Sequence, residues 1–223
     1  MIDAPSSAVP RTVTPSLFLF TLIYGAMVVL AGMLGNKQIA LGSLLAVEAG
    51  IFSFLILVAI SSAVAELHGQ ATANRLVLWS FIPLLMAILI TTLVLELPAA
   101  DQMDPDRLRA FDLILGQSPR LMIAGIIAYG TSQFLNVHIF SRLRSGRRGG
   151  AVGLAIGGAV ASALSQIIDT LLFVTISFYG IFPIGRLMGG QMIAKVVLSL
   201  AIIPFVITGL VALGRYLDSK KVA

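Results

Sequence analysis

The chain has 223 residues, of which 58% are hydrophobic and only 11% are charged, and its mean hydropathy is +1.00. Soluble domains carry about 25% charged residues, so this composition excludes an ordinary soluble fold and predicts that lipid covers most of the exterior. The absence of cysteine excludes disulfides, thiolate metal sites and cysteine nucleophiles. The net charge of +5 is typical of the cytoplasmic loops of a membrane protein, and we expect no nucleic-acid partner.

Long apolar stretches predict an all-α fold, a polytopic transmembrane bundle of about six spanning helices. A helix needs about 20 apolar residues to cross the hydrocarbon core. The predicted spans are residues 16–35, 51–67, 76–97, 120–140, 151–177 and 191–213. The segment 36–50 is too short and too interrupted by glycine for a span, so we predict a short hairpin or re-entrant turn there.

The connections between spans predict the orientation of the chain. Residues 98–119 form a polar loop rich in aspartate, whereas the loop 141–150 holds four arginines. Cytoplasmic loops are enriched in lysine and arginine, so the arginine loop and both termini are predicted to be cytoplasmic. The predicted organisation is an N-terminal cytoplasmic tail (1–15), one six-helix membrane domain (16–214) and a basic cytoplasmic tail (215–223).

Asp169 lies inside the fifth predicted span, where an ionisable side chain is costly and marks a functional candidate. Ser162, Ser165 and Gln166 share its helix face, because residues three and four apart are neighbours. This face is either the wall of a polar cavity or a source of interhelical hydrogen bonds. Lys195, near the outer start of the sixth span, either extends to the lipid headgroups or pairs with Asp169.

Two other spans carry polar candidates. In the fourth, Tyr129, Gln133 and Asn136 lie on one face, and an amide pair beside a phenol can hold a heterocycle; helix packing is the alternative. In the second, Glu66 is either a cavity carboxylate or the partner of Arg75 at the membrane interface.

The stretches Gln-Phe-Leu-Asn-Val-His-Ile-Phe-Ser-Arg-Leu-Arg at 133–144 and Ser-Gln-Ile-Ile-Asp-Thr-Leu-Leu-Phe at 165–173 form a recognisable pattern. Gly-Ile-Phe-Ser-Phe at 50–54 and Ala-Glu-Leu-His-Gly at 65–69 agree with it in order and spacing. Together these segments resemble the queuosine-precursor transporter family, also called the vitamin-uptake-like VUT family. The resemblance runs from about residue 36 to residue 204.

The resemblance implies a multi-pass carrier of the bacterial inner membrane. Its cargo would be a 7-deazaguanine precursor of queuosine, 7-cyano- or 7-aminomethyl-7-deazaguanine, destined for tRNA modification. The expected substrate-binding residues, from the resemblance and the helix faces together, are Asn36, Glu66, Tyr129, Gln133, Asn136, Gln166, Asp169 and Lys195. Arg75 and Arg120 are expected to act in structure or gating. The chain departs from the family at Ser62 and Asn136, where acids are common, which leaves the substrate and any proton coupling open.

A second hypothesis is the substrate-capture membrane subunit of an ATP-driven importer, which would need an ATPase partner because the chain has no G-x-x-x-x-G-K-[ST] loop. An enzyme is not expected, since neither H-E-x-x-H nor G-x-S-x-G occurs, and neither a cofactor nor a metal is implied. The expected partners are a nucleobase-like small molecule and membrane lipid. Gly153 and Gly157 form a G-x-x-x-G that permits close helix contact within the chain or in a homodimer.

Overall fold

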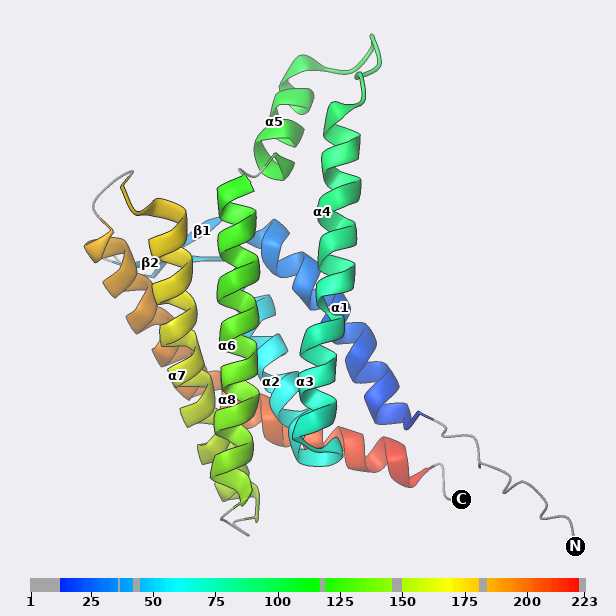
Figure 1. The fold of residues 1–223 in the computed structure, drawn as a ribbon, viewed down its shortest axis with the longest axis vertical. Helices are drawn as coiled ribbons and strands as arrows, with labels where there is room; N and C mark the ends of the chain where they lie inside the picture. The colour runs from blue at the N-terminus through cyan, green and yellow to red at the C-terminus, as the bar shows by residue number, and fades with distance from the viewer. Residues whose placement is uncertain are drawn as a thin grey trace, which may run out of the picture.

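The structure, a computed structural model, describes residues 13–35, 37–41, 45–116, 119–145, 150–180 and 184–220 and confirms the predicted all-α helix bundle. Figure 1 shows long helices packed side by side. In chain order they are α1 (Pro15–Leu34), α2 (Gly50–His68), α3 (Gln70–Trp79), α4 (Phe81–Glu96), α5 (Pro105–Leu115), α6 (Pro119–Ser145), α7 (Gly150–Phe178) and α8 (Gly185–Ser219).

Within the described residues, five helical segments are long and apolar enough to cross a membrane. They are α1, α2, the α3–α4 stretch Gln70–Glu96, α7 and Met188–Ser219 of α8. The remaining long helix, α6, has 27 residues but carries Ser132, Gln133 and Asn136 near its middle, which makes it less apolar. It packs along α7 (Figure 1), and its length makes it the sixth segment of membrane-spanning length in the described part of the chain.

A β-hairpin follows α1, at the place where a hairpin or re-entrant turn was predicted. Strands β1 (Gln38–Leu41) and β2 (Leu45–Glu48) are antiparallel, and Ile39 lies opposite Val47. Val47 is buried and β2 packs against α8, which anchors the hairpin to the bundle. We call the end of the bundle that carries this hairpin and α5 the hairpin end, and the opposite end, where α1 begins and α8 ends, the termini end (Figure 1).

The predicted polar loop 98–119 contains a helix, α5, over residues Pro105–Leu115, which the sequence analysis did not predict. The Asp104 carboxylate accepts hydrogen bonds from the backbone N–H groups of Asp106 at 2.9 Å and Arg107 at 3.0 Å. An aspartate cap followed by proline at the first helical position is a strong start signal. The charged residues of α5 are exposed, in keeping with a helix outside the membrane.

The last helix is longer than the predicted span 191–213. It begins at Gly185, six residues before the predicted start, and continues through Arg215 to Ser219. Pro204 lies inside α8, and the Thr208 hydroxyl donates to the Pro204 carbonyl oxygen at 2.9 Å, the bond to the preceding turn that serine and threonine often make inside a helix.

Close helix contacts depend on glycine at several positions. A Cβ atom on Gly157 would meet Phe140, Leu143 and Arg144 of α6, and one on Gly153 would meet Arg144, so the G-x-x-x-G packs within the chain. Gly50 begins α2, the most buried helix of the bundle, where a Cβ atom would lie 2.6 Å from the Ala31 carbonyl oxygen of α1.

We predict that Gly50→Ala lowers the thermal unfolding midpoint of the purified protein, because the backbone of α1 must move to admit the methyl group. Overpacking of this kind costs about 1–3 kcal/mol. Gly209→Ala is the matched control, since a Cβ atom there meets nothing within 4 Å. Equal midpoints for the two variants would contradict the close approach of α1 and α2.

Candidate functional site

A cavity of about 430 Å³ extends from the middle of the bundle to the hairpin end. We call it the central cavity. Its walls come from α1, α2, α4, α5, α6, α7 and α8 and are mainly aliphatic and aromatic, whereas Tyr129, Asp169 and Lys195 place polar groups at its deep end. Ligand pockets of roughly 300–1,000 Å³ with mostly apolar walls and a few convergent polar groups are typical of small-molecule sites.

The charged groups of the central cavity form an ion pair. Lys195 Nζ of α8 lies 3.1 Å from Asp169 Oδ2 of α7, and each side chain is only 8% exposed. The Ser132 hydroxyl of α6 donates to the other carboxylate oxygen at 3.2 Å, and the lysine ammonium also lies 5.9 Å from the centroid of the Phe54 ring. Of the two interpretations of Lys195, pairing with Asp169 is therefore confirmed.

Tyr129 connects the cavity to the neighbouring helices. Its hydroxyl is 2.8 Å from the Ser80 hydroxyl, between α3 and α4. Its ring meets the rings of Phe54 and Phe81 edge to face, with centroid separations of 6.3 and 5.5 Å. These contacts fix an aromatic wall beside the ion pair, against which a planar ring can pack.

The two amides of α6 form a separate buried network with α1 and α2. Gln133 Oε1 accepts hydrogen bonds from the hydroxyls of Tyr24 at 3.2 Å and Ser61 at 3.3 Å. Asn136 Nδ2 donates to Ser61 Oγ at 2.9 Å and to Ser62 Oγ at 3.2 Å. The side chains of all five residues are fully buried. Ser62 and Asn136, the two positions where the family resemblance leads us to expect acids, are thus direct neighbours.

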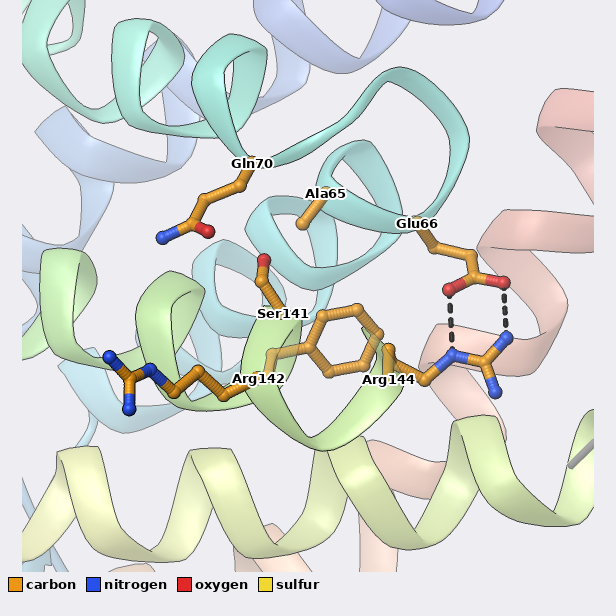
Figure 2. Close-up of a pocket in the computed structure, with 7 residues that line it drawn as sticks. Ala65, Glu66, Gln70, Ser141, Arg142 and Arg144 are labelled. Atoms are coloured by element: carbon orange, nitrogen blue, oxygen red, sulfur yellow. Dashed lines mark hydrogen bonds and ion pairs between the residues drawn. The ribbon is translucent and has the colours of Figure 1, made fainter. Parts of the chain in front are cut away.

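Glu66 lies at the termini end, away from the central cavity. Its carboxylate accepts two hydrogen bonds from the Arg144 guanidinium, one of them from Nε at 2.8 Å, as Figure 2 shows. Arg215 Nη2 of α8 lies 4.0 Å from the same carboxylate. A pocket of about 350 Å³ adjoins this pair and is lined also by Gln70 and Arg142. The alternative partner considered for Glu66, Arg75, is exposed on α3.

A second polar cluster at the termini end joins the start of α1 to the ends of α2 and α8. The Ser16 hydroxyl donates to Asp218 Oδ2 at 2.7 Å, and the Ser16 backbone N–H donates to Asp218 Oδ1 at 3.0 Å. Asp218, near the end of α8, therefore caps the first turn of α1. His68 Nε2, at the last residue of α2, lies 2.9 Å from the same hydroxyl.

The predicted site residues thus separate into three groups. Tyr129, Asp169 and Lys195 share the central cavity, Gln133 and Asn136 share the buried network, and Glu66 lies at the termini end. Gln166 is fully buried on α7, one turn from Asp169.

The structure does not describe the side chains of two further predicted residues. Asn36 lies outside the described residues, and the side chain of Arg120, at the start of α6, is also outside them.

Sequence reasoning missed three residues that the structure places in these clusters. Ser132 bonds Asp169, Tyr24 bonds Gln133, and Arg144 pairs with Glu66. A signal existed for Arg144, because it lies eleven residues after Gln133, on the same face of α6. No sequence signal distinguishes Tyr24 or Ser132 from ordinary polar residues of a span.

We predict that Asp169→Asn and Lys195→Met each destabilise the protein by about 3–5 kcal/mol, because each leaves an unpaired buried charge. The double variant should recover most of the loss, since it buries no charge. Thermal unfolding of the four proteins measures the coupling. Additive losses in the double variant would show that the two side chains do not form a pair.

Known proteins resemble this chain over a region that includes the Asp169–Lys195 pair. A family model described as "Putative vitamin uptake transporter" matches residues 48–209, which include Glu66, Gln133, Asp169 and Lys195. A protein of Bacillus subtilis (strain 168) named "Probable queuosine precursor transporter" is 27% identical over 128 residues, or 53% of this chain and 50% of that protein. The chain thus matches about half the length of this curated relative. No solved structure matches the chain.

Proposed function

The chain belongs to the family described as "Putative vitamin uptake transporter", and on that premise we propose that it imports a 7-deazaguanine precursor of queuosine across the bacterial inner membrane. The observation that carries the proposal is the buried Asp169–Lys195 pair at the deep end of the central cavity. Charged groups inside a membrane domain are expensive and mark substrate pathways. The name of the Bacillus subtilis relative supports the choice of cargo.

The pair matches the hydrogen-bonding edge of a guanine-like base. That edge presents two adjacent N–H donors and one carbonyl acceptor. The Asp169 carboxylate can accept both N–H bonds, and the Lys195 ammonium can donate to the carbonyl, once each exchanges part of its present bond for the substrate. Phe54 and Tyr129 supply apolar faces for the ring. The bound substrate thus replaces the direct Asp169–Lys195 contact with several charge-assisted hydrogen bonds. These bonds offset the free energy needed to separate the two charged side chains.

The two ends of the bundle suggest how transport proceeds. The central cavity extends to the hairpin end, whereas the Glu66–Arg144 pair and the Ser16–Asp218 contact hold the termini end together. With the termini in the cytoplasm, this arrangement is an outward-facing state with a closed inner gate. Breaking the gate contacts while the hairpin end closes would expose the substrate to the cytoplasm, as alternating access requires.

We expect purified protein to bind 7-cyano-7-deazaguanine in calorimetry, and the Asp169→Asn/Lys195→Met double variant to lose at least tenfold in affinity. The double variant is the sharper choice because its stability should be near that of the wild type. Arg109→Gln, an exposed change on α5, is the control for charge removal. A well-folded wild type that binds neither this base nor its 7-aminomethyl analogue would overturn the proposed cargo.

We also expect Glu66→Gln to loosen the inner gate, because a neutral amide holds the Arg144 guanidinium less strongly than a carboxylate does. The chain has no cysteine, so a single Ala65→Cys reporter in the adjoining pocket can be labelled cleanly. Labelling by a charged thiol reagent should be several-fold faster in the Glu66→Gln background than in the unchanged background. Equal rates would argue against a gate at this pair.

A further inference from the structure

Helices α7 and α8 carry buried polar groups that lack hydrogen-bond partners among the described residues. On α7, Ser162, Gln166 and Thr170 recur every fourth residue, and Ser199 lies on α8. All four are 0% exposed. Within the described part of the chain, neither amide atom of Gln166 has a hydrogen-bond partner, and neither do the hydroxyls of the other three residues. We call these four residues the α7–α8 seam.

Two contacts fix the level of the seam. Toward the hairpin end, Asp169 of α7 meets Lys195 of α8. Toward the termini end, Gly158 of α7 packs so closely on Ile207 that a Cβ atom there would overlap the isoleucine side chain. The two helices are therefore antiparallel, and Gln166 and Ser199 each lie about one turn inward of the ion pair and about two turns from the glycine contact. The seam therefore runs from the level of the ion pair, where Thr170 follows Asp169, toward the termini end.

Packing alone does not account for the amide of Gln166. A buried donor or acceptor without a partner loses its hydration and gains nothing in return, and in a membrane domain water is scarce. A methionine of similar shape would fill the same volume without that penalty. Two unmet atoms on one side chain, on the helix that also holds Asp169, indicate a partner that is present only part of the time.

We propose that the α7–α8 seam is a second substrate position, which the cargo occupies after it leaves the central cavity and before it reaches the inner gate. The inference rests on the proposed function. Gln166 offers one acceptor and two donors side by side, which suits a planar heterocycle whose edge combines N–H and carbonyl groups. The close contact of Gly158 with Ile203 and Ile207 forms the floor of this position. Its ligand class is therefore a lactam-bearing aromatic base.

The test separates binding from transport. Wild type, Gln166→Met and Thr208→Val are compared in calorimetry with 7-cyano-7-deazaguanine and in uptake of the same compound by proteoliposomes. Thr208→Val is the control, because it also exchanges a polar side chain for an apolar one, but its hydroxyl is already bonded to the Pro204 carbonyl oxygen. Ser199→Leu, which fills the seam from α8, is a second variant should Gln166→Met fold poorly.

The expected result is wild-type affinity in Gln166→Met and Ser199→Leu with uptake reduced at least tenfold, and no change in Thr208→Val. Unchanged uptake in both seam variants, with a higher unfolding temperature for Gln166→Met, would overturn the inference. The Gln166 amide would then destabilise the protein without a role in transport. Loss of affinity in Gln166→Met would place the amide in the first-bound site and also overturn it. Failure of the wild type to bind the base would instead overturn the proposed function, and this inference with it.

Discussion

The organisation of this bundle depends on the need to neutralise charge in a medium of low dielectric. A lone Asp169 or Lys195 at the depth of the central cavity would be costly, and the pair with its Ser132 hydrogen bond reduces that cost. Because the three side chains come from α7, α8 and α6, the contact also sets the register of these helices. The same groups that hold the helices together are therefore those available to a polar ligand.

The structure distributes its polar residues along the bundle axis rather than in one site. The ion pair lies at the deep end of the cavity, the Gln133–Asn136 network lies beside it, and the Glu66–Arg144 pair lies at the termini end. In the proposed transport cycle, this spacing would separate substrate recognition from closure of the inner gate. A bidentate ion pair such as that of Glu66 is geometrically specific, which would suit a contact of that gate.

The two departures that the family resemblance leads us to expect, at Ser62 and Asn136, would amount to one local change. The two side chains hydrogen-bond each other inside the network that also includes Ser61 and Gln133. A neutral amide–hydroxyl contact can be buried without a counter-charge, whereas two acids at this separation would repel each other unless one were protonated.

Local composition and periodicity determined much of this protein. Runs of apolar residues fixed the spanning helices, because a helix that crosses lipid must satisfy its backbone internally, and α1 and α2 end within a residue or two of their predicted limits. Only the tertiary structure decided which polar faces meet, since a helix face predicts a direction and not a partner. The placement of the helices against each other decides that Lys195 pairs with Asp169 and that Glu66 pairs with Arg144 and not with Arg75. It also leaves the buried amide of Gln166 without a hydrogen-bond partner among the described residues. The sequence does contain a local start signal for helix α5, the Asp-Pro cap, but the sequence analysis did not predict the helix because its polar composition resembles that of a loop.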